Sequence, residues 1–84
     1  MSLNRAEIYE RVVDVLKGLD QIDAGKLSPS ASFAEDLGLD EMDQAEEIIA
    51  LDEEFEIETL NKDADKITSV DQAVDYIAQT LGAD

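Results

Sequence analysis

The run from Asp36 to Phe55, DLGLDEMDQAEEIIALDEEF, decides the fold of this chain. Asp40 is placed to cap a helix with its carboxylate, and Asp43 stands three residues on, at the N3 position. The helix is expected to continue to about Phe55. The run has no Lys, Arg, His, Cys, Ser or Thr, so it offers no ordinary nucleophile. It therefore predicts a strongly acidic helix without catalytic groups.

The apolar residues of this helix divide into two rows, because each residue advances by about 100° around the helix axis. The rows are Ile48, Leu51 and Phe55, and, roughly 120° further round, Met42, Ala45 and Ile49. A small core needs one face of the helix, so the first row is expected to be buried and the second at least partly exposed. The alternative is that both rows are buried and the acidic residues are only solvated.

A first helix is expected from Arg5 to residue 18 or 19, with Asn4 as N-cap and Glu7 completing a capping box. Its apolar residues recur at helical spacing and predict one buried stripe. These residues are Ile8, Val12, Val15, Leu16 and Leu19.

The last helix is expected in TSVDQAVDYIAQTLG, where Ser69 and Gln72 form a capping box and Gly82 ends the helix. Its predicted buried stripe is Val70, Val74, Ile77 and Leu81.

Residues 20–38 form a long connection rich in turn-forming residues, which Leu27, Phe33 and Leu37 are expected to anchor. A short helical turn is expected over residues 61–66. Three main helices and one short helix predict an all-α fold, a small antiparallel bundle. We expect one domain over residues 1–84, because a chain of 84 residues can form only one small core.

The composition restricts the functions that are possible. The chain has no Cys and no His, which removes thiolate chemistry and the commonest general base and zinc ligand. Its 22 acidic and 6 basic residues give a net charge of −16, which repels nucleic acids and anionic membranes. No apolar run is long enough for membrane insertion, and the first nine residues lack the pattern of a signal peptide. We expect a non-catalytic cytoplasmic protein, a monomer on its own, whose partners are basic.

The exposed row of the acidic helix, with the carboxylates beside it, is a candidate binding surface for a partner with an apolar groove rimmed by Arg or Lys. The candidate partner-binding residues are Asp40, Met42, Asp43, Ala45, Glu46, Glu47, Ile49 and Glu53.

Beyond these patterns, FAEDLGLDEMDQAEEIIALDEEFEIE resembles the acyl carrier protein signature, in which D-L-G-x-D-S-L-D opens the second helix. The segment DADKITSVDQAVDYI resembles the closing segment of that family, and DQIDAGKLSPSASF resembles its long first loop, particularly in mitochondrial-type and related bacterial members. The resemblance implies a four-helix carrier fold in fatty acid or related lipid synthesis. It also implies carrier-dependent synthases or small helical adaptor proteins as partners, with the mitochondrial matrix as an alternative location.

The chain departs from the signature at Glu41, which stands where the family has the serine that carries 4′-phosphopantetheine. Attachment needs a hydroxyl that forms a stable phosphodiester, whereas a carboxylate would give an acyl phosphate that water destroys. We therefore expect no cofactor. Ser28, Ser30, Ser32 and Ser69 are poor substitutes, and turn or cap roles explain them. Glu41 either favours the helix start or imitates the charge of the missing phosphate.

Further differences lie near this position. Glu47 stands where the family has an apolar residue lining the acyl pocket, Ala45 where it often has Val, and ETLN replaces EIPD. A buried charge is costly, so either Glu47 turns outward or the pocket is closed. Natural divergence explains these differences better than a single blocking Ser-to-Glu substitution in a genuine carrier. That engineered variant and a wholesale redesign remain alternatives.

Another alternative is an acidic protein that binds divalent cations through Asp36, Asp40 and Asp43. Their spacing lacks the order of a calcium loop, so no dedicated metal site is expected. Paired carboxylates such as Asp40 and Asp43 could in principle serve an enzyme, but the sequence indicates no enclosed site.

Overall fold

The computed structural model describes residues 3–20 and 22–82. Its helices are α1 (Arg5–Lys17), the 3-10 turn η1 (Ala24–Lys26), α2 (Glu41–Phe55), α3 (Asn61–Ala64) and α4 (Val70–Leu81). The expected all-α fold of three main helices and one short helix is confirmed. No helix in the described part of the chain has the length and apolar character of a transmembrane span.

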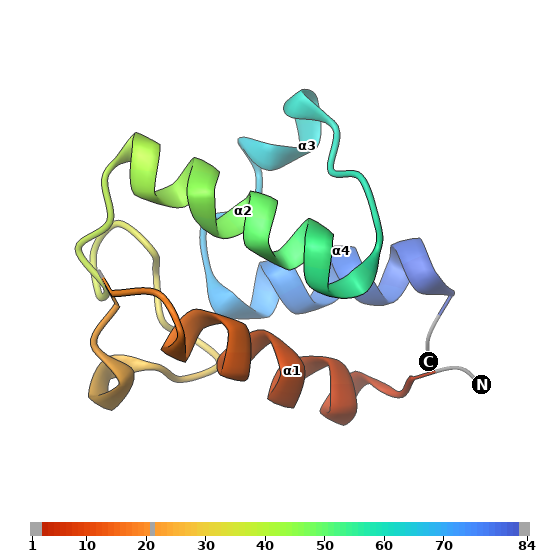
Figure 1. Ribbon diagram of the computed structural model, residues 1–84, viewed down its shortest axis with the longest axis horizontal. Helices are drawn as coiled ribbons and strands as arrows, with labels where there is room; N and C mark the ends of the chain where they lie inside the picture. Colours follow the sequence, from red (N-terminus) through yellow and green to blue (C-terminus); the bar gives the residue numbers. More distant parts are fainter. Residues whose placement is uncertain (1–2, 21, 83–84) are drawn as a thin grey trace.

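The three main helices enclose one core (Figure 1). The helix α1 runs antiparallel to both α2 and α4 and packs most extensively on α4. The helices α2 and α4 run in the same direction, because the segment that contains α3 carries the chain back across the bundle before α4 begins. The antiparallel arrangement therefore holds for α1 against its two neighbours and not for α2 against α4.

Local signals in the sequence place the helix ends. Asn4 and Glu7 form the expected capping box at α1, and the side chain of Asn4 accepts from the backbone N–H of Glu7 at 2.9 Å. At α4, the hydroxyl of the N-cap Ser69 accepts a hydrogen bond from Gln72 N–H, and Gly82 ends the helix in the left-handed conformation. The full capping box expected here is wrong, because the side chain of Gln72 accepts from the N–H and hydroxyl of Thr68.

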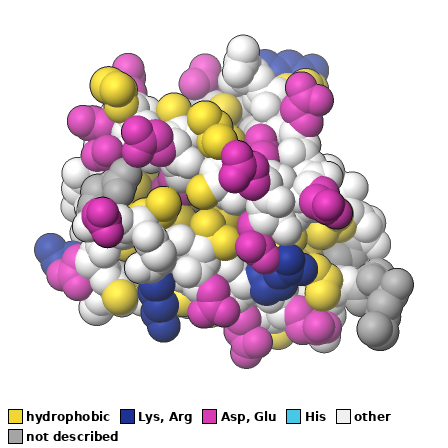
Figure 2. All heavy atoms as spheres, in the orientation of Figure 1, with side chains coloured by type: hydrophobic (Ala, Val, Ile, Leu, Met, Phe, Trp, Pro, Cys, Tyr) yellow, Lys and Arg dark blue, Asp and Glu magenta, His cyan; other side chains and the backbone are white. Residues whose placement is uncertain are grey.

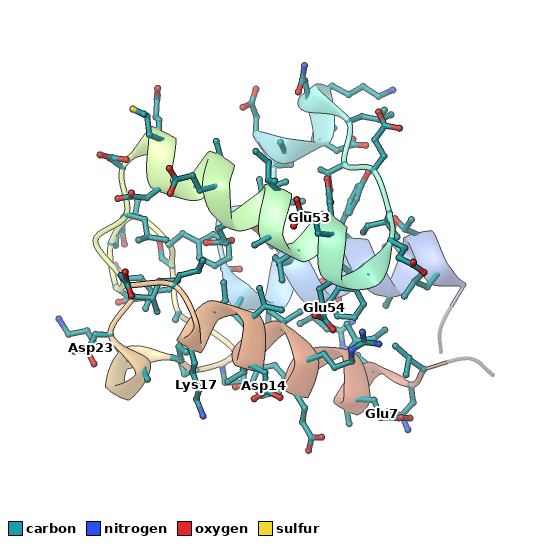
Figure 3. All side chains as sticks on the ribbon, viewed as in Figure 1. Glu7, Asp14, Lys17, Asp23, Glu53 and Glu54 are labelled. Atoms are coloured by element: carbon teal, nitrogen blue, oxygen red, sulfur yellow. The ribbon has the colours of Figure 1, made fainter. Side chains whose placement is uncertain are left out.

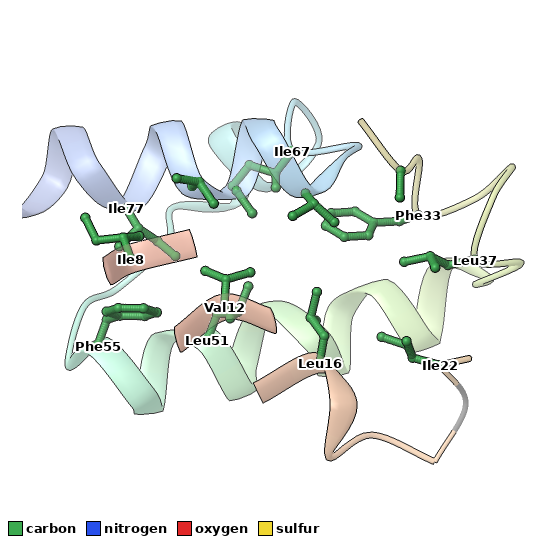
Figure 4. Close-up of a cluster of buried hydrophobic side chains, with 14 of the residues drawn as sticks. Ile8, Val12, Leu16, Ile22, Phe33, Leu37, Leu51, Phe55, Ile67 and Ile77 are labelled. Carbon is green, nitrogen blue, oxygen red and sulfur yellow. The ribbon is translucent and has the colours of Figure 1, made fainter. Parts of the chain in front are cut away.

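The core draws on all three main helices and on the long connection (Figure 4). Ile8, Phe55 and Ile77 lie at one end, and Leu16 and Leu37 lie at the other. Within the stripes expected on α1 and α4, Val15 and Leu19 are only partly buried and Leu81 is exposed. The remaining stripe residues, Ile8, Val12, Leu16, Val70, Val74 and Ile77, are buried as expected.

The connection over residues 22–40 is ordered by bonds to the start of α4. Phe33 N–H donates to the carbonyl of Thr68 at 3.0 Å, and Val70 N–H donates to the carbonyl of Ala31 at 3.1 Å. Phe33 and Leu37 are buried and Leu27 packs against the core, so the three expected anchors are confirmed. This connection fixes where α2 begins.

Candidate functional site

The helix α2 begins with a reciprocal capping arrangement. The carboxylate of Asp40 accepts from Asp43 N–H at 2.8 Å, and the carboxylate of Asp43 accepts from Asp40 N–H at 3.5 Å. The side chain of Gln44 donates to the carbonyl of Leu39 at 3.1 Å and ties the first turn to the preceding loop. The predicted cap and start of α2 are confirmed, and the residues that follow are thereby placed on defined faces.

Apolar side chains are exposed on the outer face of α2. Met42 is 74% exposed and Ile49 is 58% exposed, and the small side chain of Ala45 is exposed between them. The expectation that this row faces solvent is confirmed, and the alternative that both rows are buried is wrong. In the other row Leu51 and Phe55 are buried, and Ile48 only partly so.

Carboxylates surround this apolar row. Asp40, Glu46 and Glu53 are exposed, and Asp43 is half-buried. Glu53 and Glu54 leave α2 in different directions, and Glu54 lies between α2 and α1 (Figure 3). On the face shown in Figure 2, acidic side chains predominate over basic ones, and apolar side chains lie among them over α2. We call the following residues the α2 face: Asp40, Met42, Asp43, Ala45, Glu46, Ile49 and Glu53.

Glu47 does not belong to this face, which corrects the expectation that it meets a partner's cation. Its side chain is fully buried, and neither carboxylate oxygen has a hydrogen-bond partner among the described residues. Burial raises the pKa of Glu47 from its ordinary 4.5 to about 8, because the low-dielectric core disfavours the charged form. Of the two outcomes expected at this position, the helix has not turned the side chain outward.

The apolar space beside α2 is nearly filled. A cavity of about 10 Å³ lies between Ile48, Leu51, Ile67 and Ile77, at the lower limit for one water molecule. Asp52 and Thr59 also line it, and the carboxylate of Asp52 accepts from the N–H of Thr59 at 3.0 Å. This cavity has no room for a fatty chain in the structure.

Glu41 is the first residue of α2, and its side chain is exposed. It borders an open groove of about 410 Å³ between α2 and α3, which Gln44, Ile48 and Asp65 also line. Sequence reasoning missed this groove, because it depends on where α3 lies. A carboxylate at this place can accept hydrogen bonds but carries no hydroxyl.

Two of the four serines Ser28, Ser30, Ser32 and Ser69 accept local hydrogen bonds from backbone N–H groups. The hydroxyl of Ser32 accepts from Glu35 N–H at 3.3 Å, and that of Ser69 accepts from Gln72 N–H at 3.3 Å. These two hydroxyls have the turn and cap roles that the sequence predicted.

Within residues 3–20 and 22–82, no group of three acidic side chains is arranged to hold a metal ion. The carboxylates of Asp40 and Asp43 accept backbone N–H groups at the start of α2, and that of Asp36 accepts Ser32 N–H at 2.7 Å. The alternative of a divalent-cation protein therefore gains no support from the geometry.

Comparison with known proteins assigns the chain to a class. It is 46% identical over 76 residues to "Acyl carrier protein 2, mitochondrial" of Arabidopsis thaliana, covering 90% of this chain and 60% of that protein. It is 38% identical over 81 residues to "Acyl carrier protein" of Thermosynechococcus vestitus, covering 96% of this chain and all of that protein. The corresponding protein of Chlorobium phaeobacteroides is 35% identical over 77 residues and is covered to 99%. No family model matches the chain.

The chain belongs to the acyl carrier protein family. It spans 60% and 57% of the length of the mitochondrial relatives from Arabidopsis thaliana and Neurospora crassa. Acyl carrier proteins are carriers rather than catalysts, which agrees with the expectation of a non-enzyme, and the prosthetic group of the family is 4′-phosphopantetheine.

Proposed function

We propose that this chain is a non-catalytic binding module of acyl carrier type in fatty acid or related lipid synthesis, which docks partners through the α2 face and carries no 4′-phosphopantetheine. Membership of the family supports the pathway. The observation that carries the rest of the proposal is the carboxylate of Glu41, exposed at the first position of α2, where the signature has the modified serine.

The residues present do not fit the prosthetic group. A durable link to its phosphate needs a hydroxyl oxygen, and Glu41 offers a carboxylate instead. The cavity that remains between α2 and α4, about 10 Å³, is also too small to store an acyl chain. The buried Glu47 favours divergence over a single blocking substitution, because replacing one serine would leave the core unchanged.

The charge of the chain supports a basic partner. With a net charge of −16 and with carboxylates around Met42 and Ile49, the α2 face complements an apolar groove rimmed by Arg or Lys. Carrier-dependent synthases and small helical adaptor proteins are the proposed partners. The relatives named as mitochondrial favour the mitochondrial matrix as the location, and no finding favours the cytoplasm.

The α2 face is tested by binding of this chain to a purified carrier-dependent synthase. Ile49→Asp places a charge in the middle of the apolar row and is expected to weaken binding at least tenfold, because apolar contacts at the centre of an interface carry most of its affinity. Leu81→Asp is the matched control, since Leu81 is an exposed apolar residue at the end of α4. Equal loss of affinity in the two variants would contradict the proposed surface.

Salt provides a second readout of the same binding. Raising the ionic strength from about 0.05 M to about 0.5 M is expected to slow association several-fold, because screening shortens the range of the charge attraction. The reversal Glu53→Lys should reduce this dependence more than Asp14→Lys on α1, which changes the net charge equally. A synthase that binds with the same rate at both salt concentrations would contradict an acidic docking surface.

A further inference from the structure

The first two thirds of α2, residues 41–50, have one fully buried side chain, and that side chain is Glu47. The other buried residues of the helix, Leu51 and Phe55, lie in its C-terminal half. Ile48 and Ala50 are only partly buried. The part of α2 that bears most of the α2 face is therefore anchored in the core chiefly by an ionisable group.

The C-terminal half of α2 is bonded directly to α1 and to the segment that follows α2. Arg11 of α1 donates to the carboxylate and to the carbonyl of Glu54. The carboxylate of Asp52 accepts a hydrogen bond from the N–H of Thr59. At the N-terminal end, the cap of Asp40 and the bond from Gln44 to Leu39 join α2 to its own preceding loop. Leu51 and Phe55 thus lie in the part of α2 that is also bonded directly to α1.

Among residues 3–20 and 22–82, no charged side chain compensates Glu47. Burial is the cause of its raised pKa, with no contribution from a neighbouring charge. Arg11 of α1 donates instead to the carboxylate of Glu54. The other charged residues on the packed elements are exposed or half-buried. They are Arg5, Glu7, Glu10, Arg11, Asp14 and Lys17 of α1, Asp20, Asp23, Lys26, Glu35, Asp36 and Asp40 of the connection, Glu41, Asp43, Glu46, Asp52, Glu53 and Glu54 of α2, and Asp71 and Asp75 of α4.

We propose that Glu47 is a charge-controlled anchor: protonated, it holds residues 41–50 of α2 in the core, and on losing its proton it releases this segment while Leu51 and Phe55 keep the rest of α2 in place. The two unpaired oxygens cannot remain in an apolar core once they carry a charge, and exposure requires the segment to move. Where the proposed function holds, the charge of Glu47 also sets the position of the α2 face.

The pH range follows from the two states of the carboxyl group. In the released segment Glu47 titrates near its ordinary 4.5, whereas in the packed segment its pKa is about 8. Release is therefore least favourable below pH 4.5. It becomes roughly tenfold more favourable for each pH unit between these values, and it levels off above pH 8.

Native-state hydrogen exchange at low urea concentrations tests the proposal on the protein alone. The amides of residues 45–50, the part of the segment that lies beyond the first turn of α2, should exchange through a local opening that depends little on urea. This opening should increase about tenfold per unit between pH 5.5 and 7.5. Amides of α4 should exchange only through the urea-sensitive global unfolding. In Glu47→Leu the local opening should become pH-independent and rarer, and residues 45–50 should approach the behaviour of α4.

Two results would overturn the proposal. One is that residues 45–50 of the unaltered chain show the same urea dependence as α4 at every pH, since α2 would then open only with the whole fold. The other is that Glu47→Leu retains the pH-dependent local opening, which would assign it to another group. Because no partner is present, neither result depends on whether the α2 face binds a synthase.

A binding measurement extends the test to the partner. Affinity for the synthase at pH 6 and pH 8 should differ more for the unaltered chain than for Glu47→Leu. Equal pH dependence in both proteins would contradict the link between Glu47 and the α2 face, even where the exchange result supports the anchor.

Discussion

Glu47 and Leu51 stand one helical turn apart on the inward side of α2, and both are buried. One contributes apolar surface to the core, whereas the other brings an unpaired carboxyl group into it. The burial of Glu47 therefore lowers the stability of the folded state at pH values where a carboxyl group is ordinarily charged.

Replacing this carboxyl group should stabilise the protein. We expect Glu47→Leu to raise the free energy of unfolding by about 3 kcal/mol at pH 7. At this pH the ionisation of Glu47 stabilises the unfolded chain but not the folded one, and the substitution removes this difference. Urea denaturation measures the change. Glu53→Leu, an exposed position on the same helix, is the control and should change the value by less than about 0.5 kcal/mol. A destabilised Glu47→Leu protein would contradict the buried position of Glu47.

The stability of the unaltered chain should fall as the pH rises. The pKa of Glu47 is about 8 in the folded state against an ordinary 4.5, so this group's stabilising contribution is complete below pH 4.5. It is lost at about 1.4 kcal/mol per pH unit up to pH 8, and stability is then constant with respect to this group. The difference in unfolding free energy between this chain and Glu47→Gln, measured from pH 4 to 9, isolates the effect from the other carboxylates. Two parallel curves would show that Glu47 does not titrate in this way.

Arg11 should contribute to the attachment of α1 to α2. Its guanidinium donates to Glu54 and lies 4.8 Å from the ring centroid of Phe55. The pair is partly exposed, so Arg11→Ala is expected to cost only about 1 kcal/mol in thermal or urea unfolding. The control is Arg5→Ala, which removes an ion pair with Asp75 whose side chains are about half exposed and which should cost less. An equal loss in the control, which removes the same positive charge, would assign the effect to net charge rather than to this contact.

Asp52 should fix the segment that follows α2. Its carboxylate accepts both the N–H of Thr59 at 3.0 Å and its hydroxyl at 2.6 Å. Asp52→Ala leaves two polar groups without their partner and is expected to cost about 1 to 2 kcal/mol. A double-mutant cycle with Thr59→Val measures how much of this loss belongs to the pair. Strictly additive losses would mean that the bonds do not contribute to stability.

The fold was predictable because strong local signals agreed with one another. The Asn4 and Asp40 caps and Gly82 mark helix ends through interactions within a few residues, and the structure places the helices there. The cap of α4 was harder to predict, since Gln72 has two neighbouring donors within reach and bonds to Thr68. The partial exposure of Val15 and Leu19 depends on how α1 sits on α4, which periodicity does not give.

In the candidate site, too, some features could be predicted from the sequence and others could not. The exposure of Met42 and Ile49 followed from the spacing of two apolar rows, because a small core can cover only one of them. One feature of the sequence does indicate the burial of Glu47. This residue lies four positions before Leu51 and eight before Phe55, on the face of α2 that packs inward. A search restricted to apolar residues assigns that face to Ile48 instead. Tertiary packing decides such a case, since the pattern alone places a carboxylate outside.

Intact-mass measurement after incubation with coenzyme A and a broadly specific phosphopantetheinyl transferase tests the central claim most directly. The unaltered chain should gain no mass, because Glu41 supplies no hydroxyl at the start of α2, whereas Glu41→Ser should gain one phosphopantetheinyl group. A phosphopantetheinyl group joined covalently to the unaltered chain, at any side chain, would contradict the account.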